Sequence, residues 1–347
     1  MKACTENNLI VHAPSVHQGG GLVLLRELLQ VDTLPLQQAF LDARIQRSFS
    51  PGFIADVQYV QRSLLARLSA EWRLCLTAKS SDIVVCFHSL PPLFPCKALV
   101  VVFIQNRLLI DSSNLAGYPL PVRARLCLER IWSRMLQRRC SRYIVQTPSM
   151  AALLKRWLWR EVPISVVPFM PASFPQKKPG LYAAQRRFDF VYIASGEAHK
   201  NHRNLIEAWR LLAVDGIKPS LALTLDANVH PVLCSQIAGL VASNELAVTN
   251  LGTLSRESVD DLYQIAGAMI YPSTSESFGL PLVEAARWGF PILASELDYV
   301  RDVIEPAETF DPNSPLSIAR AVRRYLGRAE PPIKIGGAAL FLNEVLR

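Results

Sequence analysis

Short apolar runs alternate with segments of helical hydrophobic periodicity along the whole chain. Short apolar runs between turn residues are typical of buried strands, and apolar residues at every third or fourth position predict amphipathic helices. The pattern predicts strands over 9–13, 82–87, 99–104, 143–146, 164–167, 188–194, 221–225, 247–251, 267–271 and 291–295, and helices over 22–29, 55–72, 121–142, 150–159, 203–214, 231–242, 256–266, 281–288 and 316–326. This alternation predicts an α/β fold, with parallel sheets covered by helices on both faces.

One proline-rich segment, residues 168–179, interrupts the alternation. Four prolines in twelve residues are incompatible with a helix or a central strand, so we interpret the segment as part of an interdomain linker. We predict an N-terminal Rossmann-like domain over 1–172, a linker over 173–187, a C-terminal Rossmann-like domain over 188–330 and a tail over 331–347, with a last helix over 337–347. Doubly wound domains bind ligands beyond the carboxyl ends of their strands, so we expect a site in the cleft between the two domains.

Composition narrows the class of protein. Half of the 347 residues are hydrophobic and 19% are charged, which supports large cores and argues against disorder. No apolar run is long enough to span a membrane, and the first residues lack the apolar core of a signal peptide, so we expect a cytoplasmic protein. The seven cysteines are scattered without the spacing of metal ligands, and we expect reduced thiols.

Much of the net charge of +8 lies in residues 121–142, which contain seven arginines and one glutamate. Apolar residues are interleaved at helical spacing. The segment is therefore either a core helix with a solvated basic face or a helix that also contacts an anionic membrane surface. We expect no nucleic-acid binding, because no nucleic-acid-binding fold or aromatic interleaving accompanies the charge.

The run from Tyr271 to Glu284 carries the clearest candidate chemistry. It follows a predicted strand and contains a turn, a glycine and Pro281, which is favoured in the first turn of a helix. A helix that begins there exposes backbone amides to the cleft, and such amides bind phosphate. These amides belong to Ser277, Phe278, Gly279 and Leu280. Glu276 precedes the helix, and Glu284 is expected in its first turn, with both side chains directed to the cleft. Taken alone, the pair is equally consistent with glutamates favoured by the helix dipole.

The chain resembles a known family, the retaining GT-B glycosyltransferases that include sucrose synthases and many lipopolysaccharide mannosyltransferases. Residues 276–284 match the E-x7-E signature of that family, and residues 195–209 match its donor-phosphate loop and following helix. Residues 17–25 match its N-terminal glycine loop. The C-terminal half carries most of the resemblance, and the N-terminal half matches mainly in layout.

The resemblance implies roles for individual residues. Glu276 would contact the donor sugar, Glu284 the ribose hydroxyls, and Lys200 the departing diphosphate, where negative charge grows in the transition state. Gly20 and Gly21 would bring the N-terminal backbone close to that diphosphate. The amides of Phe278, Gly279 and Leu280 would bind sugar and phosphate. No Asp-x-Asp motif is placed in such a cleft, so we expect no metal and no cofactor.

The sequence departs from the family pattern in two places. The arginine that usually precedes the lysine is absent, and His199 or Arg203 is a candidate substitute. Where relatives carry a histidine after an N-terminal strand, this chain has Gln105. His88 also follows a strand, and it is either a second candidate for the donor sugar or a loop histidine with local partners.

These features predict a retaining glycosyltransferase that moves a hexose, with mannose favoured, from a nucleoside diphosphate sugar to a glycan or lipid-linked acceptor in cell-surface polysaccharide synthesis, such as lipopolysaccharide O-antigen. Two alternatives stay open. A nucleotide-sugar epimerase on the same fold would need more acids and histidines in the cleft than this chain offers. A non-catalytic relative that binds a partner enzyme would be favoured by loss of Glu276, Glu284 or Lys200, and all three are present.

Overall fold

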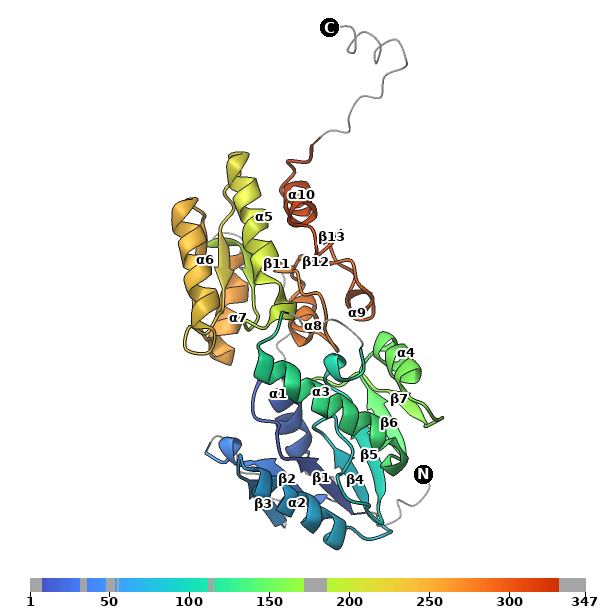
Figure 1. Cartoon of the computed structure of the whole chain (residues 1–347). Helices are drawn as coiled ribbons and strands as arrows, with labels where there is room; N and C mark the ends of the chain where they lie inside the picture. The colour runs from blue at the N-terminus through green and yellow to red at the C-terminus, as the bar shows by residue number, and fades with distance from the viewer. Residues whose placement is uncertain are drawn as a thin grey trace, which may run out of the picture.

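The computed structural model of the protein describes residues 8–31, 36–47, 54, 56–111, 115, 117–171 and 186–330. Within these ranges the chain forms two α/β domains that lie one above the other, each built on a sheet of parallel strands (Figure 1). The predicted α/β class is confirmed. Only residues 186 and 187 of the predicted linker 173–187 are described, and the predicted tail 331–347 lies outside the described residues. The domain limits therefore stay predictions.

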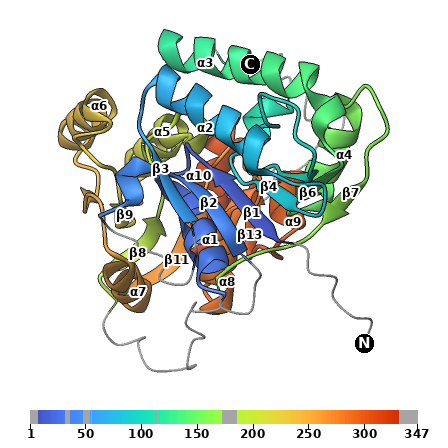
Figure 2. The same cartoon turned by 90° about the horizontal axis from the view of Figure 1, so that it is seen from below.

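The N-terminal sheet has seven strands in the order β3-β2-β1-β4-β5-β6-β7. Every neighbouring pair is parallel. Helices lie on both faces of this sheet, and Figure 2 shows them from below. The elements are β1 (Leu9–Ala13), α1 (Gly19–Leu29), β2 (Leu36–Asp42), η1 (Ala43–Ile45), β3 (Asp56–Val60), α2 (Leu64–Thr77), β4 (Ile83–Cys86), β5 (Leu99–Phe103), η2 (Arg107–Leu109), α3 (Leu120–Met135), η3 (Gln137–Arg139), β6 (Arg142–Val145), α4 (Pro148–Trp157) and β7 (Ile164–Val166).

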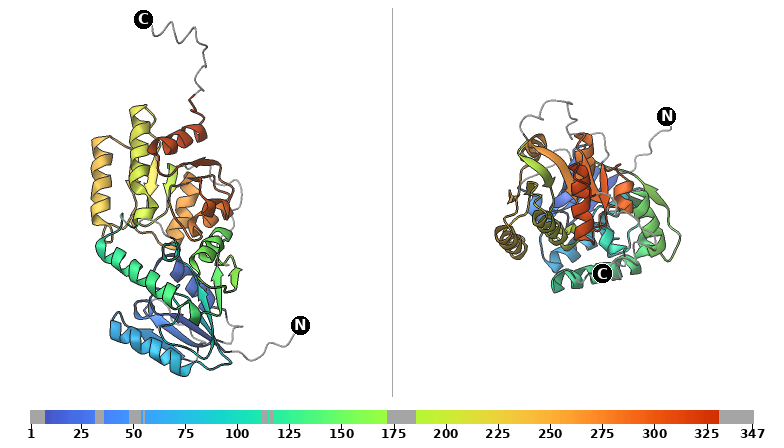
Figure 3. Two further views of the ribbon diagram at one scale, coloured as in Figure 1. Left: turned by 45° about the vertical axis from the view of Figure 1, so that its right-hand side comes forward. Right: turned by 90° about the horizontal axis from the view of Figure 1, so that it is seen from above.

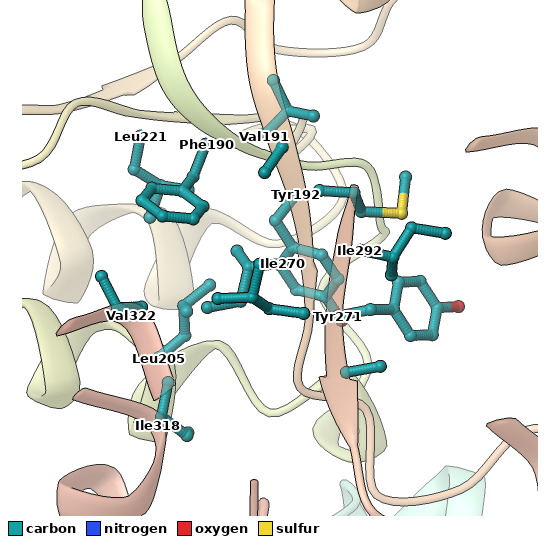
Figure 4. Packing of buried hydrophobic residues seen from close by; sticks show 14 of the residues in the cluster. Phe190, Val191, Tyr192, Leu205, Leu221, Ile270, Tyr271, Ile292, Ile318 and Val322 are labelled. Carbon is teal, nitrogen blue, oxygen red and sulfur yellow. The ribbon is translucent and has the colours of Figure 1, made fainter. Parts of the chain in front are cut away.

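The C-terminal sheet has six parallel strands in the order β10-β9-β8-β11-β12-β13. Its core packs Phe190 and Ile270 of the central strands against Leu205 of α5 and Ile318 of α10 (Figure 4). The elements are β8 (Phe188–Tyr192), η5 (Ala198–Lys200), α5 (His202–Val214), β9 (Leu221–Leu223), α6 (Pro231–Ser243), β10 (Val248–Asn250), α7 (Arg256–Ile265), β11 (Ala266–Tyr271), α8 (Leu280–Arg287), β12 (Ile292–Ser295), α9 (Asp298–Arg301), β13 (Glu308–Phe310) and α10 (Pro315–Tyr325).

The prediction of one helix over residues 55–72 is wrong. The structure has the strand β3 followed by α2, which begins after Ser63. The Ser63 hydroxyl accepts a hydrogen bond from the amide of Ala66 at 3.1 Å, and this cap fixes the helix start. The strand forms because β3 pairs with β2 along its whole length, a tertiary contact that outweighs the local helical periodicity.

Two strands were not predicted from the sequence, and both form through pairing within a sheet. The strand β2 contains two glutamines and shows no regular alternation, yet it is buried between β1 and β3. The strand β13 has three residues at the sheet edge. Across the described part of the chain, no helix is both long enough and apolar enough to cross a membrane.

Each sheet has one point where the strand order reverses, and these two points position the site. The order reverses between β1 and β4 in the N-terminal sheet and between β8 and β11 in the C-terminal sheet. Ligands of doubly wound sheets bind beyond the carboxyl ends of the strands at this point. The loops that follow β1, β4, β8 and β11 are therefore the expected walls of a site, and the two domains meet on this side, with α1 of the lower domain beneath α8 of the upper one (Figures 1 and 3).

Candidate active site

A cleft of about 500 Å³ lies between the two domains. This volume is in the range of pockets that hold cofactors and small molecules. Its walls come from all four switch-point loops, and it is lined from the N-terminal side by Gly20, Gly21, His88 and Gln105 among others. From the C-terminal side it is lined by Ala194, Ser195, Lys200, Tyr271, Glu276, Ser277, Phe278, Gly279, Leu280 and Pro281.

The first turn of α8 faces this cleft. Gly279 precedes the helix with φ +74°, a left-handed conformation that glycine adopts without steric cost, and Pro281 follows in the first turn. None of the backbone amides of residues 277–280 donates to a carbonyl or side chain within the described residues. The amides and the positive end of the helix dipole therefore form a group of donors suited to a phosphate or a sugar hydroxyl.

Lys200 and Glu276 form an ion pair at the wall of the cleft. The Lys200 Nζ donates to Glu276 Oε1 at 2.6 Å, and the two side chains are only 14% and 11% exposed. Oε1 also accepts from the hydroxyls of Tyr271 at 2.9 Å and Ser273 at 2.7 Å. No donor in the described residues contacts the second oxygen, Oε2, so this oxygen is the one placed to bind a ligand hydroxyl.

The ion pair also sets the charge of Glu276. Burial by itself would raise the pKa of this carboxyl, but Lys200 and His199 nearby and the hydrogen bonds from Lys200 and Ser273 lower the pKa below its ordinary value. Glu276 is therefore ionised at neutral pH. Lys200 retains further N–H donors that are not used by Glu276, and they can contact an anionic ligand.

The position of Lys200 is fixed by the loop after β8. Asn201 adopts φ 61°, and its side-chain amide donates to the carbonyls of Pro272 at 3.0 Å and Pro312 at 2.7 Å. The Tyr192 hydroxyl donates to the Lys200 carbonyl at 2.7 Å. These bonds join the loop to residues that are distant in sequence, so the lysine is held in place before any ligand arrives.

Glu284 lies apart from the residues that line the cleft. It is in the second turn of α8, since the helix begins at Leu280, so its predicted place in the first turn is wrong. Its Oε1 accepts from Arg256 Nη1 at 2.7 Å. Burial raises the pKa of Glu284, and Arg256 acts against this rise. Contact between Glu284 and a ribose stays a prediction.

His199 also lies outside the cleft lining and makes a contact between the domains. Its Nδ1 is 2.7 Å from the hydroxyl of Tyr118, and the two rings stack with centroids 6.3 Å apart. Burial lowers the pKa of His199. Arg203, the other proposed substitute for the missing arginine, pairs with Gln236 at 3.3 Å on the surface. The structure therefore brings neither side chain into the cleft wall.

Gly20 and Gly21 lie in the first turn of α1 and not in the loop predicted at residues 19–21. A Cβ atom on Gly20 would lie 2.9 Å from Leu280 Cδ1 of the opposite domain, and one on Gly21 would lie 3.2 Å from Gln105 Oε1. Both glycines line the cleft, as predicted. The lack of a side chain on Gly20 allows α1 to approach the start of α8.

The structure adds residues to the site that the sequence did not indicate. Tyr271 and Ser273 hold Glu276, and Arg125 and Glu129 of α3 line the cleft. Burial raises the pKa of Glu129. The basic helix therefore contributes to the cleft wall, and no signal in its sequence distinguished these two residues from the solvated ones.

The chain is similar to known proteins in sequence and in fold. The family described as "Glycosyl transferases group 1" matches residues 174–339. The match covers nearly half of the chain and shows that this segment is similar to the group 1 glycosyl transferases.

Related sequences carry mannosyltransferase names. The chain is 26% identical over 221 residues to the serotype-specific mannosyltransferase WbdA of Escherichia coli, a match that covers 58% of this chain and 27% of WbdA. It is 29% identical over 138 residues to the O-antigen chain mannosyltransferase B of Escherichia coli, covering 39% of this chain and 36% of that protein. The matches thus span about a quarter to a third of the length of these relatives.

Solved structures with the same fold cover nearly the whole chain. Anabaena Alr3699/HepE in complex with UDP-glucose superposes with a TM-score of 0.68 at 15% identity, covering 92% of this chain and 89% of that one. A glycosyltransferase from Rickettsia africae ESF-5 superposes with a TM-score of 0.64 at 14% identity, covering 92% and 88%. At these identities the likeness shows the fold alone, which is GT-B.

Replacement of Gly20 by valine is expected to weaken nucleotide-sugar binding by roughly tenfold. The added side chain meets the end of the Leu280 side chain and displaces it within the cleft wall, a misplacement of the kind that is costly to a binding site. Calorimetric titration with a donor that binds the native protein would measure the change. Gly239→Ala is the control, because Gly239 lies in α6 with open space around it. Equal affinities of Gly20→Val and the native protein would contradict the prediction.

Proposed function

We propose that this protein is a group 1 glycosyl transferase that moves a hexose, with mannose favoured, from a nucleoside diphosphate sugar to a glycan or lipid-linked acceptor in cell-surface polysaccharide synthesis, with retention at the anomeric carbon and without a metal in the cleft. The observation that carries the proposal is the position of the Lys200–Glu276 pair beside the amides at the start of α8. The names of the Escherichia coli relatives support mannose and O-antigen. The UDP and glucose in the HepE structure support a nucleotide sugar as donor.

The chemistry follows from the donors on the C-terminal wall. The amides of residues 277–280 bind the diphosphate and sugar, and Lys200 stabilises the charge that grows on the diphosphate as the bond from its oxygen to the anomeric carbon breaks. The free oxygen of Glu276 accepts a hydrogen bond from a sugar hydroxyl and keeps the anomeric carbon oriented. The acceptor oxygen forms its new bond on the same face, and its proton passes to the departing phosphate oxygen.

The N-terminal wall supports an acceptor site. Gln105 lines the cleft, and its side-chain amide donates to the Phe87 carbonyl at 2.6 Å, which fixes its direction. The backbone amide of Gln105 donates to the Ser89 hydroxyl at 2.8 Å. Arg125 and Glu129 stand on the same wall, so the acceptor meets both a cation and a carboxyl group. Closure of the domains over both substrates excludes water and limits hydrolysis of the donor.

The test is a screen of GDP-, UDP- and other nucleotide sugars for an increase in the melting temperature of the purified protein. A true donor stabilises the folded state by mass action. The donor that raises the melting temperature is then incubated with the protein and with lipid-linked or free glycan acceptors. Proton NMR of the product reports the anomeric configuration of the new linkage. A donor that binds without any transfer would favour the non-catalytic alternative, and an inverted product would exclude retention.

A membrane-bound acceptor is supported by the outer surface of the N-terminal domain. Helices α2 and α3 lie side by side there, since the Arg67 guanidinium of α2 lies 5.6 Å from the centre of the Trp132 ring of α3. Large apolar side chains are exposed on both helices: Leu64, Leu65, Leu68, Trp72 and Leu76 on α2, and Leu120, Leu128, Ile131 and Met135 on α3. Exposed arginines flank them: Arg123, Arg125, Arg134 and Arg138. Apolar residues next to arginines are typical of helices that lie on anionic membranes.

The double substitution Leu128→Glu with Met135→Glu is expected to reduce binding to vesicles that contain anionic phospholipid by at least fivefold. It places two negative charges on the exposed apolar face of α3 and opposes insertion into the headgroup layer. Flotation with vesicles at low and high salt measures the bound fraction. Val232→Glu, at an exposed position of α6 in the other domain, is the matched control. Native protein that stays unbound at low salt would refute membrane contact through this face.

A further inference from the structure

A buried cluster of three polar side chains lies in the N-terminal domain and adjoins the cleft through His88 alone. His12 comes from β1, Glu71 from α2, and His88 follows β4. The three are 0%, 1% and 9% exposed, and one metal-ligating atom of each lies within 4.8 Å of the others. His12 Nε2 is 3.7 Å from Glu71 Oε1. The proposed transfer reaction uses none of these contacts.

The polar atoms that face the middle of this cluster lack partners. Both ring nitrogens of His12, the Oε1 of Glu71 and the Nε2 of His88 make no hydrogen bond to the described residues. Buried polar atoms in native proteins are nearly always paired, so three such atoms, one from each residue, within 4.8 Å of one another indicate a missing group. That group has to bind nitrogen and oxygen lone pairs at the same time.

The second polar atoms of His88 and Glu71 are already held by the fold. His88 Nδ1 donates to the His12 carbonyl at 3.0 Å, which leaves the lone pair of His88 on Nε2. Glu71 Oε2 accepts from the Leu93 amide at 2.8 Å, which leaves Oε1 directed at the cluster. In metal sites the atom of a ligand residue that does not bind the metal commonly makes such a hydrogen bond. The bond orients the side chain toward the metal.

The charges around the cluster are compatible with a cation. Both imidazoles are buried beside the carboxyl group of Glu71, and a neutral imidazole is the form that binds a metal. One cation, Arg67, lies nearby, and its charge is opposed by Glu71, Glu129 and Asp42. Arg139 also acts on Glu71, and its guanidinium is occupied by the carbonyls of Pro92 and Leu93.

We propose that His12, Glu71 and His88 form a buried site for one divalent transition metal ion, most favourably Zn²⁺, that joins β1, α2 and the segment after β4. Two imidazoles and a carboxylate are a common ligand set for zinc. Ligand atoms of a tetrahedral zinc ion lie roughly 3.4 Å apart at the usual bond lengths, close to the 3.7 Å separation of His12 and Glu71. Three protein ligands leave the fourth position to a water molecule, and the ion supports the wall that carries His88.

The experiment measures metal and stability and uses no sugar, so its outcome is independent of the transfer reaction. The whole chain is stripped with a chelator, and its metal uptake is measured with Zn²⁺ by elemental analysis and with Co²⁺ by visible absorption. We expect one equivalent per chain, the intense absorption of tetrahedral Co²⁺, and an increase in melting temperature of roughly 5 °C with Zn²⁺.

Variants locate the site. His88→Gln and His12→Gln are each expected to lose the Co²⁺ absorption and the stabilisation by Zn²⁺, whereas His230→Gln, outside the cluster, retains both. If His12→Gln does not fold, His88→Gln alone decides the question, because His88 lies at the cleft wall. Absence of Co²⁺ absorption in the native protein, or equal stabilisation by Zn²⁺ of native protein and His88→Gln, would overturn the proposal and leave an ordered water as the group in the cluster.

Discussion

Replacement of Lys200 by alanine is expected to lower kcat about 10²- to 10³-fold, because the departing diphosphate loses the cation placed next to it. The ammonium is only 14% exposed and is held by the loop after β8, so water and mobile surface lysines do not replace it. In the proposed site the amides of α8 supply most of the donor contacts in the ground state, so the affinity for the donor should change less than kcat. Steady-state kinetics with the donor found in the screen, together with calorimetric titration, separates the two effects.

The matched control is Lys218→Ala. Lys218 also pairs with a glutamate, Glu245, at 3.3 Å, but both side chains lie on the surface. The activity of Lys218→Ala should stay within twofold of that of the native protein, since exposed ion pairs contribute little.

Glu276→Gln should also reduce kcat more than the affinity for the donor. The double variant Lys200→Ala with Glu276→Gln should lose less than the product of the single losses, because the two side chains are in contact. Single variants of Lys200 and Glu276 that both turn over normally would remove the site assignment.

Replacement of Glu284 by alanine is expected to raise the donor dissociation constant roughly 10- to 100-fold. This follows from the net loss of one hydrogen bond between a ribose hydroxyl and a carboxylate, which contributes about 1.5–3 kcal/mol. Arg256 lies outside the cleft lining, donates a hydrogen bond to one oxygen of Glu284 and so orients the carboxylate. Turnover at saturating donor should fall much less than affinity. Calorimetric titration with the nucleoside diphosphate alone isolates the nucleotide contact from the sugar contact.

Glu207→Ala is the control for Glu284→Ala. Glu207 pairs with Arg210 at 2.6 Å in α5, on the surface and away from the cleft. Native affinity is expected for this variant. If Glu284→Ala binds the nucleoside diphosphate as tightly as Glu207→Ala does, Glu284 is a structural partner of Arg256 and the ribose is bound elsewhere.

Much of the site was predictable because its signals are local. The apolar strand β11, the turn after it, Gly279 and Pro281 are consecutive in the chain, and each constrains the backbone through its own geometry. The start of α8 was therefore predicted to within one residue. The same holds for β8 and the loop that ends in Lys200, where a buried strand is followed by turn residues and a periodic helix.

Other features depend on contacts between distant segments. Residues 56–60 form β3 only because β2 lies beside them, and β2 itself has no clear strand pattern. Glu284 carries the family spacing, yet its pairing with Arg256 is set by the packing of α7 against the sheet. A local pattern reports the preferences of a few neighbouring residues and contains no information on which strand or helix will cover them.

By itself, the sequence determined the two parallel-sheet domains and the anion-binding start of α8, because these follow from hydrophobic period and from the backbone limits of glycine and proline. Only the tertiary structure decided that Lys200 contacts Glu276, that α3 contributes Arg125 and Glu129 to the cleft, and that His12, Glu71 and His88 converge beside it. These groups are brought together by the order of the strands, which arises from the packing of the whole sheet.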